Sequence, residues 1–141
     1  VFDPRRQVIS LWRSSDGGQR WFPGAEMPSL YPIAASWGDP AMIALPGVVL
    51  VSGADPTAAW RRAEFDIPDV TIRTFAGDSS RLYALSLISG VFVSEDRGAH
   101  WRHLPLDLPQ DELMDICVEA GRLYVLMVGG RAAVVEPERT D

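Results

Sequence analysis

Residues 14–21 read Ser-Ser-Asp-Gly-Gly-Gln-Arg-Trp, and residues 94–101 read Ser-Glu-Asp-Arg-Gly-Ala-His-Trp. Both segments match Ser-x-Asp-x-Gly-x-x-Trp, so the same four fixed positions recur in two distant parts of the chain. Between them, residues 53–60 keep the aspartate (Asp55) and the tryptophan (Trp60) but lose the serine and the glycine. The three aspartates follow one another at nearly equal intervals, which indicates a structural repeat of about 40 residues.

A second motif has the same period. Residues 81–85, Arg-Leu-Tyr-Ala-Leu, recur one period later at 122–126 as Arg-Leu-Tyr-Val-Leu. A weaker copy, Ala-Met-Ile-Ala-Leu, stands one period earlier at 41–45. Because two independent motifs share one period, the sequence predicts a true repeat protein.

Each repeat consists of short apolar runs rich in β-branched and aromatic residues, separated by Gly, Asp, Ser and Pro. In the third repeat these runs predict strands at 70–75, 81–87, 91–94 and 99–104. No window of 11 or more residues carries a sustained helical period. Four antiparallel strands in about 40 residues are typical of a β-propeller blade, so we expect an all-β fold built of such blades.

The number of blades is too small to close a ring. We expect one partial propeller domain over residues 1–141, with blade pieces at 1–24, 30–64, 70–104 and 112–136. The first piece holds only a third and a fourth strand (8–14 and 19–22), and the last holds three strands (113–118, 122–128 and 131–135). Closed propellers have four to eight blades, and unpaired end blades expose edges and apolar faces. The chain is therefore expected to associate with a second copy or with another propeller segment.

The eight-residue motif falls on the turn between the third and the fourth strand of a blade. Its glycine allows a positive φ, its serine and aspartate can bond backbone N–H groups of the turn, and its tryptophan can bury a large ring. A local turn lock explains every fixed position better than a metal or catalytic carboxylate does. The predicted structural residues are Ser14, Asp16, Gly18, Trp21, Asp55, Trp60, Ser94, Asp96, Gly98 and Trp101.

These residues resemble the Asp-box, or BNR repeat, of the sialidase-like and sortilin-like propellers, some large glycoside hydrolases and a photosystem II assembly factor. Two of the three boxes are complete, and the box at Asp55 departs from the pattern at Gly53 and Thr57. The resemblance implies that the boxes are structural and lie opposite the ligand face. It also favours an extracytoplasmic location. It supports the fold more strongly than any function.

The loops from a fourth strand to the next first strand (23–30, 65–69 and 105–112) contain six acidic residues and no Arg. These are Glu26, Asp66, Asp69, Asp107, Asp111 and Glu112. One interpretation is that they are solvated loops whose charge keeps the protein in solution. The other is a docking face for a basic protein partner or a cation.

Composition excludes several function classes. The chain is 47% hydrophobic and 23% charged with a net charge of −6, which argues against nucleic-acid binding. No apolar run approaches the roughly 18 residues of a membrane span. The single cysteine, Cys117, excludes an internal disulfide, and its apolar neighbours predict a buried thiol. His100 and His103 are expected on opposite faces of a strand, so neither a metal nor a cofactor is predicted.

Enzymatic activity within this chain is not favoured. A sialidase-like site would need a tyrosine nucleophile and several arginines, but Tyr83 and Tyr124 occupy equivalent repeat positions that are typical of core packing, and Tyr31 stands alone. Asp69 and Asp111 could serve as paired carboxylates of a glycosidase, but nothing fixes their separation. The leading hypothesis is a non-catalytic scaffold or protein-interaction module. The alternative is part of a sialidase-like glycoside hydrolase whose catalytic residues lie outside this chain.

Overall fold

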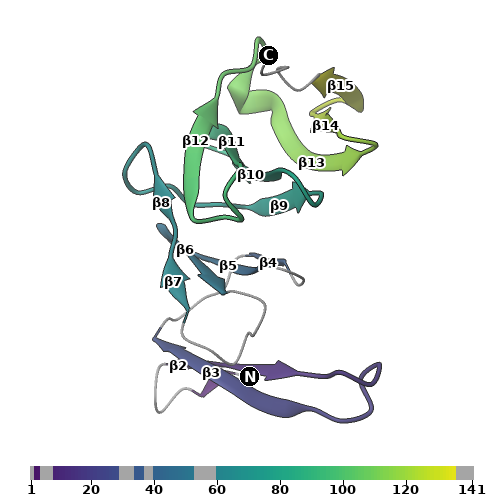
Figure 1. Cartoon of the computed structure of the whole chain (residues 1–141). Helices are drawn as coiled ribbons and strands as arrows, with labels where there is room; N and C mark the ends of the chain where they lie inside the picture. The colour runs from purple at the N-terminus through teal and green to yellow at the C-terminus, as the bar shows by residue number, and fades with distance from the viewer. Residues whose placement is uncertain (1, 4–7, 29–33, 37–39, 53–59, 136–141) are drawn as a thin grey trace.

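The computed structural model describes residues 2–3, 8–28, 34–36, 40–52 and 60–135. Their strands form four sheets, which follow one another from the N-terminal sheet at the bottom of Figure 1 to the C-terminal sheet at the top. This arrangement confirms an all-β fold of propeller blades. No helix in the described part of the chain is long and apolar enough to cross a membrane.

The first sheet contains β1 (Phe2–Asp3), β2 (Val8–Arg13) and β3 (Phe22–Pro28), and the second contains β4 (Ala34–Ser36), β5 (Ala41–Leu45), β6 (Val48–Ser52) and β7 (Arg61–Arg62). The third contains β8 (Glu64–Phe65), β9 (Thr74–Gly77), β10 (Leu82–Ser86), β11 (Gly90–Ser94) and β12 (His100–Leu104). After a 3-10 turn (Gln110–Glu112), the last sheet contains β13 (Leu113–Glu119), β14 (Arg122–Met127) and β15 (Arg131–Val135).

The third sheet holds a full four-stranded blade. Strands β9, β10, β11 and β12 pair antiparallel in chain order, and β8 adds to the outer strand β12 in parallel. Strand β9 contacts both β4 and β13, the first strands of the sheets on either side. First strands therefore meet along one side of the row, as they do around the axis of a propeller.

The core lies between successive sheets. In the first cluster, one face of β5 and β6 packs on the third sheet. The members of this cluster include Met42, Ala44, Val49, Val51, Ala84, Phe92 and Trp101. In the second cluster, the other face of β10 and β11 packs on the last sheet, through Tyr83, Leu85, Val91, Val93, Leu123 and Val125. Because strand side chains alternate between faces, the third sheet packs on the second sheet with one face and on the last sheet with the other.

Several predicted strand bounds are wrong. Strand β9 begins at Thr74 rather than at residue 70, although Val70 and Ile72 are buried in the first cluster. Apolar alternation cannot distinguish such a core-filling segment from a strand, because both bury every second side chain. In the first sheet, residues 19 and 20 belong to the turn and β3 runs on to Pro28, while β1 adds a short strand beside β2.

The register of the 41–45 repeat is also shifted by one residue from the sequence match. Ala41 pairs with Ser52 as Leu82 pairs with Ser94, so Met42 occupies the place of Tyr83. Accordingly, Met42 faces the following sheet in the first cluster, as Tyr83 does in the second. A one-residue shift exchanges the two faces of a strand, and burial decides between them.

Candidate functional site

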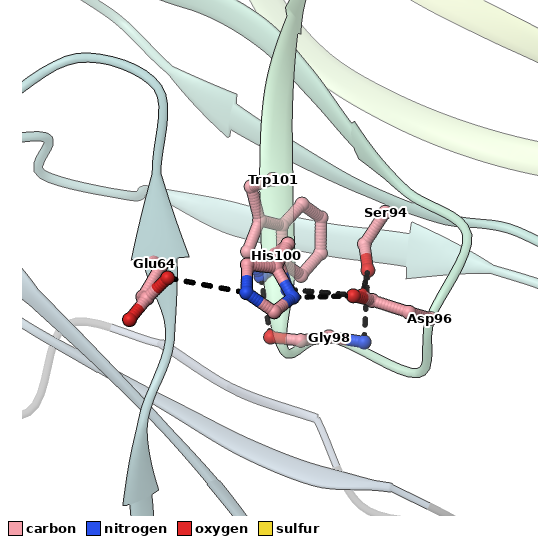
Figure 2. Close-up of polar contacts among 6 residues, drawn as sticks. All are labelled: Glu64, Ser94, Asp96, Gly98, His100 and Trp101. Carbon is pink, nitrogen blue, oxygen red and sulfur yellow. Dashed lines mark hydrogen bonds and ion pairs between the residues drawn. The ribbon is translucent and has the colours of Figure 1, made fainter.

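The 94–101 turn is closed by four hydrogen bonds (Figure 2). The Ser94 hydroxyl donates to Asp96 Oδ1 (2.9 Å) and accepts from the Gly98 N–H (2.9 Å). The His100 N–H donates to the same Asp96 oxygen (2.9 Å), and Trp101 Nε1 donates to the Gly98 carbonyl (2.8 Å). The side chains of Ser94, Asp96 and Trp101 thus all bond within the turn itself.

The 14–21 turn repeats this network. Ser14 Oγ donates to Asp16 Oδ1 (2.9 Å), and the Gly18 N–H donates to Ser14 Oγ (2.8 Å). The Arg20 N–H donates to Asp16 Oδ1 (2.9 Å), and Trp21 Nε1 donates to the Gly18 carbonyl (3.0 Å). The bond from the Arg20 N–H holds the pKa of Asp16 below its usual value. The same four residue types therefore build the same turn in two separate blades.

The two turns differ in what covers them. Trp101 is 2% exposed and stacks on Phe65 with ring centroids 5.7 Å apart. A Cβ on Gly98 would lie 3.3 Å from Met42 Sδ, so the turn rests directly on the preceding sheet. Trp21 is 57% exposed, and a Cβ on Gly18 would meet only the Trp21 ring. The lock forms in both turns, but only the second has a neighbour to pack against.

His100 connects the second turn to β8. Its Nδ1 lies 2.6 Å from Asp96 Oδ2, and its Nε2 lies 3.1 Å from Glu64 Oε2 (Figure 2). The hydrogen bond to Asp96 and the charges of both carboxylates raise the pKa of His100. Burial acts to raise the pKa of Asp96, but the bonds from His100 and Ser94 outweigh it, so that pKa is lowered.

The three groups do not form a metal site. The two imidazole nitrogens point to different carboxylates, so the groups form a chain and do not converge on one point (Figure 2). Nowhere in the described residues do three His, Cys, Asp or Glu side chains gather in a metal-binding cluster. His103, on the opposite face of β12, packs its ring edge-on against Phe92.

The degenerate third motif is only partly visible. Asp55 lies outside the described residues, whereas Trp60 is half-buried. It packs beside Ile43, Leu45, Val48 and Leu50 on the face of the second sheet that points away from the third sheet. Trp60 and Trp101 thus both lie on the face of their sheet that is turned toward the N-terminal end of the row.

Two of the predicted acidic loops leave the same end of the molecule. Strands β8 and β12 are parallel, so the loops that follow them start at the same end, and the 94–101 turn lies at the other end of β12. Asp66 Oδ2 accepts a bond from the His103 N–H (2.8 Å), and Glu112 is paired with Arg131. The fold thus engages two acidic groups, while Asp69, Asp107 and Asp111 are exposed.

A cavity of about 420 Å³ opens beside the first of these loops. Its lining includes Gly47, Val49 and Arg62 from the second sheet and Phe65, Ile67 and Asp69 from the segment that leads to the third. The lining combines apolar walls with charged groups. Sequence reasoning missed this cavity, because its walls come from segments whose approach depends on the packing of the sheets. The exposed apolar Ile67 next to Pro68 and Asp69 was the one local signal.

Other sequence expectations need correction. Glu26 lies within β3, paired with Ser10, and not in a loop, because pairing continues to Pro28. Cys117 is exposed, because Ile116 and Val118 take the core-facing positions on β13 and alternation turns the thiol outward. Tyr83 is buried in the second cluster as expected, whereas Tyr124 is only half-buried, because Leu123 and Val125 take the core-facing positions on β14. Tyr31 lies outside the described residues.

Comparison with known proteins identifies the class of the fold. No protein-family model and no curated protein matches the sequence. Among solved structures, "YCF48 bound to D1 peptide" aligns with a TM-score of 0.64 and 21% identity over 93% of this chain. A glutaminyl cyclase from Myxococcus xanthus aligns with a TM-score of 0.47 and 14% identity over 93% of the chain. The chain spans 44% and 66% of these two proteins. The first likeness supports the β-propeller fold.

Proposed function

We propose that this chain is a non-catalytic segment of an Asp-box β-propeller that serves as a protein-interaction module and is completed by another chain or segment. The Asp-box assignment is supported by the two matching turns, in which serine, aspartate and tryptophan bond only within the turn. Groups used in this way are not available for catalysis. Glycoside hydrolysis receives no comparable support, since Tyr83 is buried in the core.

The acidic end of the molecule carries the interaction part of the proposal. Asp69, Asp107 and Asp111 are exposed on two loops that start at the same end of the parallel strands β8 and β12. Asp69 also lines the cavity, whose walls are partly apolar. Such a surface suits a peptide that combines basic and apolar side chains, because opposite charge steers the encounter and apolar contact adds affinity. In its solved structure YCF48 is bound to D1 peptide, so a peptide ligand is compatible with this fold.

A peptide-binding measurement tests the proposal. The probe is a fluorescein-labelled peptide of alternating Arg and Leu, with a Glu-Leu peptide of equal length for comparison, followed by fluorescence anisotropy at 50 and 300 mM NaCl. We expect the basic peptide alone to bind, and its affinity to fall with salt. The combined Asp69→Asn, Asp107→Asn and Asp111→Asn variant should weaken binding by about tenfold or more, which corresponds to roughly 1.4 kcal/mol.

The matched control is Glu119→Gln, which removes one exposed carboxylate at the end of β13, outside these loops. It should bind the basic peptide as the unchanged chain does. Equal binding of the acidic and basic peptides, or equal loss in the control and the loop variant, would contradict an acidic docking face. Asp66 and Glu112 are left unchanged, because each has a structural partner whose loss would confuse the result.

A further inference from the structure

The two end sheets of the row each leave an apolar face uncovered. We define the N-terminal face by Trp12 and Trp21, which are 45% and 57% exposed. We define the C-terminal face by Tyr124, Leu126, Ala132 and Val134 on β14 and β15. Leu126 and Val134 are 44% and 51% exposed, a large fraction for apolar side chains on the same face of one sheet. Large apolar side chains exposed together on one face of a sheet are typical of an interaction site.

The C-terminal face is the repeat of a face that is buried inside the chain. In the third sheet, Tyr83 pairs with Val93 and Leu85 pairs with Val91; in the last sheet, Tyr124 pairs with Val134 and Leu126 with Ala132. Leu85 and Val93 are almost completely buried, because the last sheet covers them. The C-terminal face therefore has the pattern of a surface that receives the next blade.

The N-terminal face corresponds to the face of the third sheet that packs on the sheet before it. Trp12 stands two residues before Ser14, as Phe92 stands two residues before Ser94. Trp21 occupies the place of Trp101 in the matching turn. Phe92 and Trp101 are both buried in the first cluster, against the face of the second sheet that points toward the third sheet. Trp12 and Trp21 therefore present the face that, in the third sheet, packs on a preceding blade.

We propose that two copies of this chain associate head to tail, with the N-terminal face of one copy packed on the C-terminal face of the other. The contact continues the joint that the chain already makes twice, between its second and third sheets and between its third and fourth. This proposal rests on the proposed function in one respect: it names a second copy of the chain as the partner that completes the propeller. A specific contact of this kind is expected to bury roughly 800 Å² on each copy.

Sedimentation velocity over a range of concentrations tests the assembly. The N-face variant is Trp21→Asp, the C-face variant is Leu126→Asp with Val134→Asp, and the control is Ile88→Asp, an exposed apolar residue on the turn between β10 and β11. We expect the unchanged chain and the control to associate, and each face variant to associate at least about tenfold more weakly, as loss of a central apolar contact produces.

Mixing the two face variants separates this arrangement from others. Each variant keeps the face that the other has lost, so an equimolar mixture should associate more strongly than either variant does alone. A misfolded variant could not restore association in this way. A monomeric unchanged chain, face variants that associate normally, or a mixture that stays monomeric would each overturn head-to-tail pairing. No peptide is present, so the outcome is independent of the acidic docking face.

Discussion

The turns at 14–21 and 94–101 have the same hydrogen bonds but different surroundings. In both, serine and aspartate tie down backbone N–H groups and the indole N–H bonds the glycine carbonyl. The second turn is buried on the preceding sheet, whereas the first is exposed at the end of the row. The sequence of the motif is therefore enough to shape the turn.

The difference separates two sources of stability that a repeat protein combines. Hydrogen bonds within a turn belong to one blade and form without a neighbour. Burial of Phe92 and Trp101 belongs to the joint between two blades and needs both. In repeat proteins these terms add as intrinsic and interface contributions. Comparing the same substitution in the two turns measures the interface contribution directly.

The largest effect is expected from the two tryptophans. Trp101→Ala should lower the free energy of unfolding by about 3–5 kcal/mol, because it empties a large site in a packed core. Trp21→Ala should change it by less than about 1 kcal/mol, since that ring is more than half exposed. Urea denaturation followed by circular dichroism gives both values.

The tryptophan comparison is best made in the background of Leu126→Asp and Val134→Asp. These changes remove the association proposed above, so that burial of Trp21 in a dimer does not contribute to its apparent stability. Equal losses for the two tryptophans would mean that the first turn has a covering neighbour within its own chain.

A medium effect is expected from the turn lock. Asp96→Ala removes the acceptor of the Ser94 hydroxyl and of the His100 N–H, and should cost about 1–2 kcal/mol of unfolding free energy. Asp96→Asn keeps an oxygen acceptor and should restore part of the loss. Asp16→Ala should act in the same direction but less, because water reaches the exposed turn. Loss of peptide binding at unchanged thermal stability would contradict a structural role for Asp96.

The sequence predicted those features of the fold that each repeat contains within itself. The period, the all-β blades and the residues of both turns follow from local spacing, and the strands of the last sheet were placed almost correctly. Features that depend on contacts between sheets were not predictable. The exposure of Cys117, the register of Met42 and the placement of Val70 ahead of β9 each depend on which face is covered. The pairing of Glu112 with Arg131 likewise joins residues that the sequence assigns to different elements.

The smallest effect concerns pH, and it arises from a position where the two turns differ in sequence. The residue before the tryptophan is Arg20 in the first turn and His100 in the second. The neighbouring carboxylates Asp96 and Glu64 raise the pKa of His100 above its usual value of 6.5. Its contribution to stability is therefore fully present below about pH 6.5 and is lost as the pH rises through the raised value.

His100→Arg is the variant that tests this effect, because it places in the second turn the residue that the first turn has at the same position. Arginine stays charged throughout, so the melting temperature of the unchanged chain should fall relative to that of the variant between about pH 6 and pH 9. At acid pH the melting temperature depends on Asp96 instead. Its pKa is lowered, so its contribution to stability is lost only as the pH falls through that lowered value. Thermal melts at half-unit pH steps give both curves. Curves that run parallel through neutral pH would show that the contacts of His100 with Asp96 and Glu64 do not contribute to the stability of the folded chain.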